Sequence, residues 1–424
     1  MPNLCDKFDP EFVELYNSLG EVSCQTSPDD FYTLLNKLYA FNVEVQDEWL
    51  YKECLPYTNP EWYGFCETAS GAENSQALLD SYNLGKDIRL PSGTFCIDNT
   101  VFNIDDKSQD FVLKGQGTSA TILETSGGTG VLVNINSGAS QLQGDKNSIN
   151  IEDLGFRSKV TGGNIGLHIS DNSSAGDAGT SVMRTIDNVS FAGSTDTNYY
   201  GEGIRITDGS YFDIENVRGS GPEGSTGGIL INILGDKNSV DNNIRNAKGR
   251  NFEYGVKTNS RNEGTVIADS NFVNVDYGVY SEAILDATET GQPWLRVSGG
   301  HIAAYKKGIY SDDNTQLMVN DTLIYLLADN SIGIDVLRSS ATIGVSGSIY
   351  TNNSITSITG ANNIGMRMGQ YSGQSIISSN IINGMDIALQ FLVIANQFTG
   401  GSNIFSNNNT NIDDNGGSNT VTFV

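Results

Sequence analysis

Two carboxylates, Glu282 and Asp312, follow repeated glycine motifs at the same distance and could act together on a glycosidic bond. Each lies four residues after a glycine, Gly278 or Gly308. If the two motifs stack as neighbouring parallel strands, the carboxylates are about 4.8 Å apart. A retaining glycosidase holds its nucleophile and its acid/base about 5 to 5.5 Å apart. The spacing predicts that one carboxylate attacks or activates water and the other protonates the leaving oxygen, the alternative being an ordinary solvated acidic surface.

The same face is predicted to carry the residues that bind the substrate. Side chains two and four residues after each glycine must point outward, because the aliphatic residues one and three positions on point inward. The residues two positions after the glycines are His168, Arg205, Leu230, Lys257, Tyr280, Tyr310, Asp335 and Arg367. The residues four positions after the glycines are Ser170, Thr207, Asn232, Asn259, Glu282, Asp312, Leu337 and Gly369. Tyr280 and Tyr310 are predicted to stack on sugar rings and Lys257 to bind an acidic group. Asp335 and Arg205 complete the predicted substrate-binding set.

The elements that position these residues repeat along the chain. The glycine motif starts at Gly166, Gly203, Gly228, Gly255, Gly278, Gly308, Gly333 and Gly365, in steps of 23 to 37 residues. Steps of 20 to 50 residues with variable insertions are typical of a solenoid, in which each coil keeps its strands and lengthens only its loops. We expect about ten to thirteen coils, with Ile204, Ile206, Val256, Val279, Ile309 and Ile334 inside.

A second column of short polar residues lies at turns between strands. It follows an Ile-x-(Asn/Asp) pattern and comprises Asp153, Asn188, Asn216, Asn246 and Asp269. Such side chains hydrogen-bond neighbouring backbone and tolerate the left-handed conformation. We therefore expect a structural ladder and no ligand site here.

The composition excludes several classes of protein. The chain of 424 residues has 24 basic and 50 acidic residues, a formal charge of −26, which would repel nucleic acid. Its 48 glycines indicate a turn-dense β protein. No secretory signal or apolar run of membrane-spanning length is visible, so we expect no membrane insertion. The five cysteines include no C-x-x-C pair, and we expect neither a metal site nor another cofactor.

The first part of the chain has a different pattern. Helical spacing of apolar residues and the helix start Ser27-Pro28-Asp29-Asp30 predict a small α-helical domain over residues 1–70. A short amphipathic helix is expected over 71–85, followed by strands over 86–424. The Pro91-Ser92-Gly93 turn and Gly115-Gln116-Gly117 then occur in order with the helix. This arrangement resembles the entry to the right-handed parallel β-helix of the pectate lyase superfamily, in which the helix caps the coil.

The order of a helical unit and then a β-helix with an acidic face resembles a bacteriophage tailspike. That resemblance implies an all-β, right-handed, single-stranded parallel β-helix with a small N-terminal helical domain that docks on phage tail or capsid proteins. It also implies a homotrimer, assembled in the host cytoplasm, which is part of the virion and binds or cleaves host surface polysaccharide.

Two alternatives stay open: a non-catalytic virion fibre or adhesion protein, and a free polysaccharide lyase or hydrolase. Under the lyase alternative the second-choice catalytic set is Glu152, Asp187 and Glu215. With Arg245 beside them, these carboxylates are similar to the calcium cluster and arginine base of polysaccharide lyases, so Ca²⁺ is expected only there. His168 and His301 have no G-x-S-x-G motif with them and are read as surface or loop residues.

Overall fold

The computed structural model describes most of the chain after residue 56. The described residues are 57–85, 87–105, 110–136, 148–172, 184–239, 241–262, 264–283, 294–314, 316–337, 347–369, 375–392, 397–415 and 420–423. The chain divides into two compact units, Met1–Thr58 and Asn59–Val424. The helices predicted for the first unit lie outside the described residues. Residues 59–70 belong to the second unit, where Pro60–Tyr63 forms a 3-10 helix.

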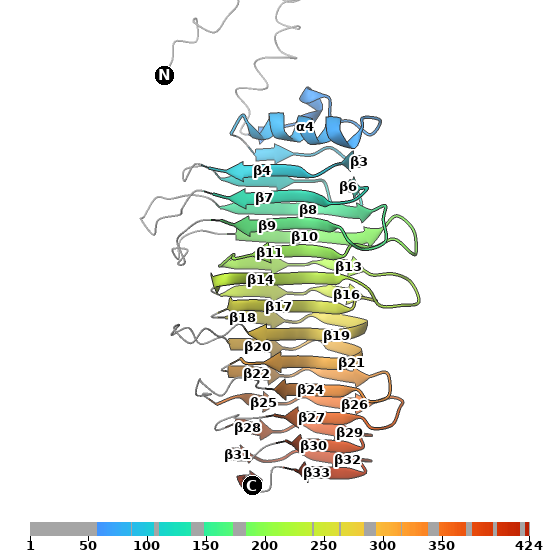
Figure 1. Ribbon diagram of the computed structural model, residues 1–424, viewed down its shortest axis with the longest axis vertical. Coiled ribbons are helices and arrows are strands. Elements are labelled where there is room, and N and C mark those ends of the chain that lie inside the picture. Colours follow the sequence, from blue (N-terminus) through green and yellow to red (C-terminus); the bar gives the residue numbers. More distant parts are fainter. Residues whose placement is uncertain are drawn as a thin grey trace, which may run out of the picture. The chain divides into compact units, whose positions relative to one another are not determined.

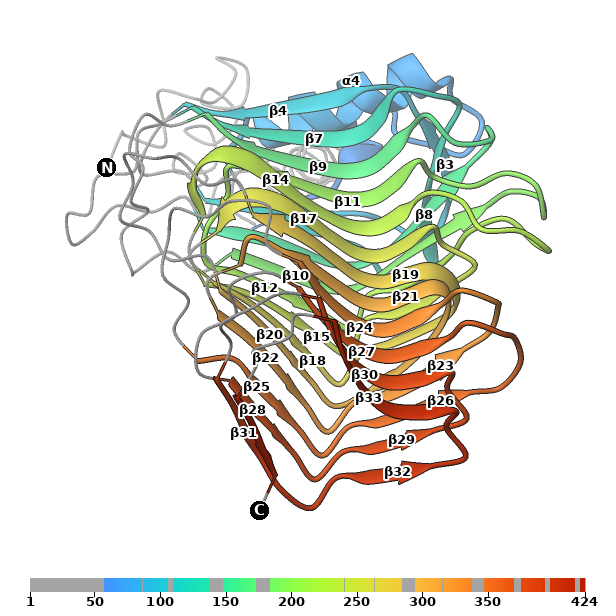
Figure 2. The same cartoon turned by 60° about the horizontal axis from the view of Figure 1, so that its bottom comes forward.

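The second unit is a coil of short parallel strands (Figures 1 and 2). Each strand pairs in parallel with the equivalent strand of the next coil. The strands therefore form three parallel sheets along the β-helix, which are named here faces 1, 2 and 3. The predicted right-handed, single-stranded parallel β-helix is confirmed.

The bounds of the strands are as follows. Face 1 contains β2 (Asp87–Arg89), β5 (Phe111–Lys114), the first half of β8 (Ile149–Ser158), the first half of β10 (Arg184–Gly193), β12 (Phe212–Glu215), β15 (Asn242–Arg245), β18 (Thr265–Ala268), β20 (Trp294–Ser298), β22 (Gln316–Asn320), β25 (Ile349–Thr351), β28 (Ser375–Ser378), β31 (Gln397–Gly400) and β34 (Thr420–Phe423). Face 2 contains β3 (Gly93–Ile97), β6 (Thr121–Thr125), the second halves of β8 and β10, β13 (Arg218–Ser220), β16 (Lys248–Arg250), the first halves of β19 (Asn271–Ala283) and β21 (His301–Asp312), β23 (Leu323–Leu326), β26 (Ser354–Ser357), β29 (Ile381–Asn383) and β32 (Ile404–Ser406). Face 3 contains β4 (Thr100–Ile104), β7 (Thr129–Ile135), β9 (Ile165–Asp171), β11 (Glu202–Thr207), β14 (Ile229–Ser239), β17 (Tyr254–Asn262), the second halves of β19 and β21, β24 (Ile332–Leu337), β27 (Ile364–Met368), β30 (Ile387–Phe391) and β33 (Thr410–Asp414).

A helix covers the N-terminal end of the coil (Figure 1). It is α4 (Gly71–Tyr82), which begins with a capping box between Ser70 and Glu73. Its side chains bind the first coil: Asn74 donates to the Cys96 carbonyl at 3.0 Å, and the Tyr82 hydroxyl donates to the Asn103 carbonyl at 2.8 Å. The core therefore begins beneath a closed end.

The inside of the coil is apolar, as predicted. The six residues expected there, Ile204, Ile206, Val256, Val279, Ile309 and Ile334, are all fully buried. The glycines stack because the inner side of face 3 leaves no room for a side chain. A Cβ atom on Gly278 would lie 2.5 Å from Ile302 and 2.6 Å from the Gly308 carbonyl oxygen.

The predicted register is wrong at one coil. In β14 the residue stacked on Gly203 is Leu230 and not Gly228, so the outward residue two positions on is Asn232. Leu230 is therefore buried, not outward. The physical reason lies on face 2, where Gly219 and Gly249 of the next coil stand at the position of Phe191. The space that these glycines leave inside is filled by Leu230 together with Phe252, and both side chains lie over both glycines. In this coil a bulky residue, Leu230, stands on face 3 where the neighbouring coils have glycine, and a glycine, Gly219, stands on face 2 at the position of Phe191.

The polar turn column has the structural role that the sequence predicts. Asp153, Asn188, Asn216, Asn246 and Asp269 all have left-handed backbone, with φ between 49° and 60°. Amides in the column also bond from coil to coil: Asn188 donates to Asp153 and Asn246 to Asn216, each at 2.6 Å. The turns between faces 1 and 2 therefore hold the coils in register.

Candidate functional site

Glu282 and Asp312 lie opposite each other on neighbouring strands of face 3. Their Cα atoms are register partners in the pairing of β19 with β21, so the strands separate them by about 4.8 Å. Glu282 is exposed, whereas Asp312 is only 8% exposed. The register that the sequence implies is present, with one carboxylate open to solvent and the other largely enclosed.

A tyrosine two residues before each carboxylate donates to it. The Tyr280 hydroxyl lies 3.3 Å from Glu282 Oε2, and the Tyr310 hydroxyl lies 3.2 Å from Asp312 Oδ2. Burial, followed by the charge of the adjacent carboxylate, raises the pKa of Tyr280 to about 12 and also raises the pKa of Tyr310. Both hydroxyls therefore stay protonated at neutral pH and can donate, which fixes the two carboxylates in place.

Four tyrosines form one cluster on this face, named here the tyrosine cluster. Its members are Tyr254, Tyr277, Tyr280 and Tyr310. Tyr254 stacks on Tyr277 with ring centroids 5.0 Å apart, Tyr280 stacks on Tyr310 at 4.7 Å, and Tyr280 meets the edges of the first pair. Tyr310 is only 8% exposed, so it supports Tyr280 rather than offering an open ring. Tyr254, Tyr277 and Tyr280 are partly exposed and present aromatic surface.

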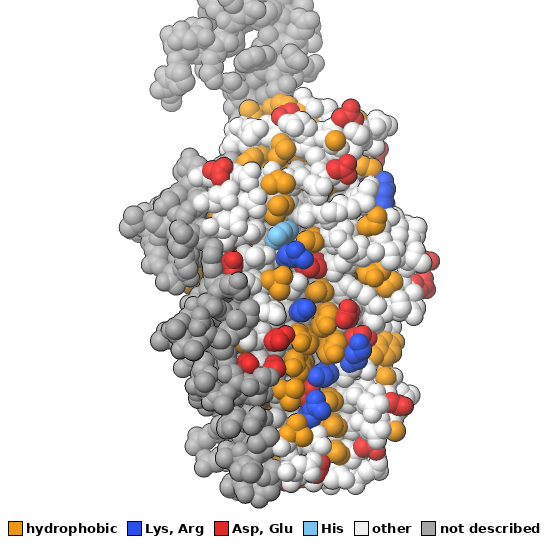
Figure 3. Space-filling model, viewed as in Figure 1, with side chains coloured by type: hydrophobic (Ala, Val, Ile, Leu, Met, Phe, Trp, Pro, Cys, Tyr) orange, Lys and Arg blue, Asp and Glu red, His pale blue; other side chains and the backbone are white. Residues whose placement is uncertain are grey.

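Lysine side chains surround the tyrosine cluster. The Lys257 ammonium lies 5.1 Å from the ring centroid of Tyr254 and 5.8 Å from that of Tyr280, and Lys307 lies 4.0 Å from that of Tyr310. These are cation–π distances. Lys257 has no ion pair among the described residues, so its charge remains available to an anionic ligand. Figure 3 shows this face, on which hydrophobic side chains and charges of both signs gather over the lower coils.

Asp335 lies beneath this surface. It is fully buried, receives two hydrogen bonds of 2.7 Å from the Arg367 guanidinium, and pairs with Lys307 at 2.6 Å. A buried carboxylate cannot contact a bound sugar as the sequence predicts. Its effect on the face is to hold the two cations.

Arg205 lies in an earlier coil, away from the cluster. It pairs with Glu202 of the same strand, and Glu202 also accepts from Asn232 at 2.8 Å. His168 lies next to Arg205 in the register of β9 and β11, and its Nε2 is 3.0 Å from the Thr207 hydroxyl. Burial, then the charge of Arg205, lowers the pKa of His168 to about 4. Of the predicted site residues, the structure thus brings together Glu282, Asp312, Tyr280, Tyr310 and Lys257, and leaves Arg205 apart.

The second-choice set forms a column on face 1. Glu152, Asp187 and Glu215 are register partners, and Arg245 follows Glu215. The column alternates with amides and cations: Lys114 lies 2.9 Å from Glu152, Asn216 donates to Asp187 at 2.7 Å, and Arg245 lies 3.7 Å from Glu215. Among the described residues, no three His, Cys, Asp or Glu side chains are grouped as a metal ion requires. The three carboxylates thus pair with two cations and an amide along the surface of face 1.

Three residues of the face were missed because only positions after each glycine were considered. Tyr254, Tyr277 and Lys307 each stand directly before the repeat glycine, where side chains also point outward. The repeated Tyr-Gly-Val at Tyr254 and Tyr277 is the signal that could have identified them. Within the described residues, no helix is long and apolar enough to cross a membrane.

Comparison with known proteins identifies structures of the same fold. No protein-family model and no curated protein matches the chain. The N-terminal fragment of bacteriophage phi29 gene product 12 superposes with a TM-score of 0.52 at 13% identity, covering 89% of this chain and 75% of that one. The likeness is in the fold. The pre-mature form of that gene product gives a TM-score of 0.52 at 12% identity, covering 90% of this chain and 59% of that one. A single-residue variant of the catalytic domain of a GH87 alpha-1,3-glucanase, in complex with nigerose, gives a lower TM-score of 0.43 at 14% identity, covering 86% of this chain and 67% of that one.

Proposed function

We propose that this protein is a bacteriophage virion component, a tailspike that binds and cleaves a polysaccharide of the host surface on face 3. The observation that carries the proposal is the tyrosine cluster, with two register-paired carboxylates that each accept a tyrosine hydrogen bond. Partly exposed aromatic rings offer stacking surface to sugar rings, and Lys257 offers a charge beside them. The fold shared with phi29 gene product 12 supports the assignment to a phage.

The chemistry follows from the different surroundings of the two carboxylates. Asp312 is enclosed and held by Tyr310, so it suits the group that must keep a fixed position against the anomeric carbon. Glu282 reaches solvent and suits proton transfer to the leaving oxygen and from water. Attack by Asp312 would form a glycosyl ester while Glu282 protonates the departing oxygen, and water activated by Glu282 would then release the sugar.

The proposal also includes a homotrimer that docks on tail or capsid proteins through the N-terminal region. A long coil leaves side faces that association of identical chains can bury, and cyclic symmetry closes such an assembly. A non-catalytic virion fibre with the same sugar-binding face is the second candidate. It is favoured by the enclosure of Asp312, which leaves little of this side chain open to a substrate.

The test is a reducing-end assay on capsule or lipopolysaccharide of host strains. Glu282→Gln and Asp312→Asn should each lower the cleavage rate by several orders of magnitude while binding and the unfolding midpoint stay close to those of the wild type. Glu215→Gln on face 1 tests the second-choice set in the same assay and should cleave normally if face 3 carries the active site.

Normal cleavage by both amide variants would place the active site elsewhere. Glu152, Asp187 and Glu215 on face 1 would then be tested next. Binding without cleavage by the wild type would favour the non-catalytic fibre. In that case Tyr277→Ala should still weaken binding, because it removes a partly exposed ring of the cluster.

A further inference from the structure

A hollow on face 2 carries positive charge that nothing in the described part of the protein balances. Its volume is about 680 Å³, and it spans the outer surface of β10, β13, β16 and β19. The lining includes three exposed cations, Arg218, Lys248 and Arg250, and no acidic residue. In a chain with 50 acidic and 24 basic residues, a hollow lined only by cations and polar or apolar groups is unexpected.

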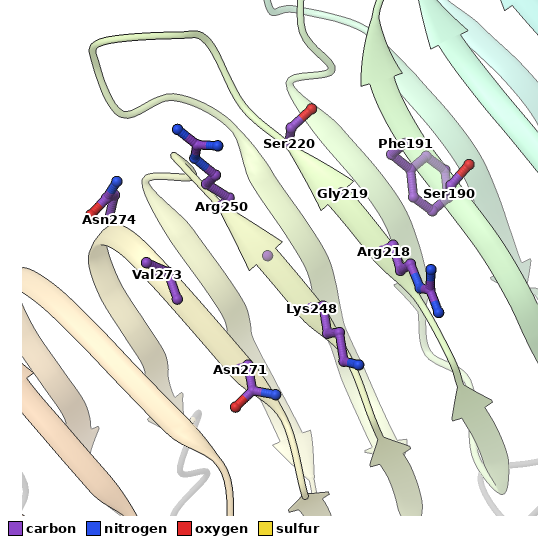
Figure 4. Close-up of a pocket in the computed structure, with 11 residues that line it drawn as sticks. Ser190, Phe191, Arg218, Gly219, Ser220, Lys248, Arg250, Asn271, Val273 and Asn274 are labelled. Carbon is purple, nitrogen blue, oxygen red and sulfur yellow. The ribbon is translucent and has the colours of Figure 1, made fainter.

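The strands fix the backbone positions of the three cations. Arg218 and Lys248 are register partners, so about 4.8 Å separates their Cα atoms. Arg250 lies two residues further along β16, about 6.6 Å from Lys248. Figure 4 shows Arg218 and Lys248 side by side on neighbouring strands and Arg250 further along β16. Among the described residues none of the three forms an ion pair, unlike Arg205, Arg245 and Arg367.

Hydrogen-bonding groups surround the charges. Ser190, Ser220, Asn271 and Asn274 line the same hollow. A second hollow of about 300 Å³ adjoins it and shares Ser220 and Arg250. Its further lining is polar and includes two carboxylates, Asp196 and Glu223. Volumes of about 300 to 1,000 Å³ are those of small-ligand sites, and this combination of cations beside hydroxyl, amide and carboxylate groups suits a sugar with an acidic substituent.

The hollow is continuous in the chain with the tyrosine cluster. Strand β16 ends at Arg250, and β17 begins four residues later at Tyr254. Likewise Asn274 in β19 precedes Tyr277 by three residues. One glycan chain passing over the turns between faces 2 and 3 could therefore reach both surfaces.

We propose that this hollow is a second glycan subsite, which binds the acidic group of a sugar in the host polysaccharide through Arg218, Lys248 and Arg250. That the ligand is a glycan rests on the function proposed above, whereas its negative charge rests on the hollow itself. A carboxylate or a phosphate would supply the negative charge that these cations attract. The ligand carries isolated charges, because a densely charged polymer would be repelled by a chain of −26.

The experiment measures binding to immobilised bacterial surface polysaccharides whose repeat units carry one uronate, one phosphate or no charge. The triple variant Arg218→Gln, Lys248→Gln, Arg250→Gln is compared with the wild type, and Arg296→Gln, an exposed arginine on face 1, is the matched control. We expect the wild type to bind an acidic glycan about a hundredfold more tightly than the triple variant does, at roughly fivefold per charge. The control should bind normally, and the affinity of the wild type should fall with added salt.

The outcomes separate this inference from the function proposed for face 3. Binding of uronate glycans alone or phosphate glycans alone identifies the acidic group, and binding of both supports the charge as the shared feature. Equal binding by the triple variant, or binding only to neutral glycans, overturns the subsite while leaving face 3 as a sugar-binding surface. Tighter binding of a single-stranded oligonucleotide than of any glycan also overturns it, and binding to no glycan overturns both proposals.

Discussion

Asp335→Asn should destabilise the coil measurably without touching its apolar core. Asp335 is fully buried, and its carboxylate accepts both hydrogen bonds of the Arg367 guanidinium and the ion pair of Lys307. Removing the charge from a buried pair costs about 3 to 5 kcal/mol when the partner stays buried. Here the side chains of Lys307 and Arg367 are 21% and 24% exposed, so water can solvate them in part. The asparagine oxygen also still accepts one hydrogen bond, and we expect a loss of about 2 to 3 kcal/mol.

This loss converts into a modest change of the unfolding midpoint. Unfolding entropy is about 2.1 cal/mol/K per residue, so a unit of roughly 370 residues has about 0.8 kcal/mol/K. A loss of 2 to 3 kcal/mol then lowers the midpoint by about 3 to 4 °C. Calorimetry measures the midpoint, and urea unfolding gives an independent free energy, which matters because solenoids can unfold in more than one step.

Two further variants test whether the ion pairs of Asp335 stabilise the coil. Asp196→Asn, an exposed carboxylate, is the control and should change the free energy of unfolding by less than about 0.5 kcal/mol. The triple variant Lys307→Met, Asp335→Leu, Arg367→Met should recover most of the lost stability, because it removes the unpaired charges together. If Asp335→Asn unfolds within 1 °C of the wild type, the ion pairs contribute nothing beyond their own desolvation, and the account of Asp335 as the residue that holds the two cations fails.

Three other predictions concern packing, pH and assembly. Leu230→Ala should cost about 2 to 5 kcal/mol. Adding Gly219→Ala should restore part of this loss once the Phe252 ring shifts slightly, because a Cβ at Gly219 would lie 2.5 Å from Leu230 and 2.9 Å from Phe252 in the wild type; strictly additive effects would contradict the exchanged packing. Between pH 6.5 and about 4 the unfolded chain binds a proton at His168 that the folded chain does not, so the free energy of unfolding falls as the pH falls. The unfolding midpoint of His168→Gln should therefore fall less over this range than that of the wild type. Equal decreases in the two midpoints would contradict this account. Light scattering at micromolar concentration should give three times the chain mass, and a stable monomer would argue for a free enzyme.

The coil and its inward residues could be predicted from the sequence because both follow from one period. An inward side chain must match the coil above and the coil below, so the glycine and the two aliphatic positions after it recur in a readable order. Ile309 and Ile334 could therefore be assigned to the core without knowing their neighbours. The assignment failed at β14, where Leu230 takes the place of the glycine. That exchange depends on Gly219 and Gly249 of another face, and no local pattern contains this information.

The site could be predicted only in part, because outward residues are not constrained by the coil. The offset from Gly278 and Gly308 identified Glu282 and Asp312 as neighbours, since register alone fixes that relation. Whether an outward side chain is open to a ligand depends on its own partners, which is why Asp335 was placed at the surface although Lys307 and Arg367 enclose it.

The cations of face 2 illustrate the same limit more strongly. The strands β13 and β16 have three residues each and lack the glycine motif that set the register, so Arg218, Lys248 and Arg250 belonged to no column. The two inward glycines between them are also the ones whose space Leu230 fills. The coils that depart from the regular core pattern on the inside are thus the coils that carry, on the outside, three cations without an ion pair among the described residues. A ligand on face 2 would explain this coincidence, because packing alone gives no reason to place three such cations over the same two glycines.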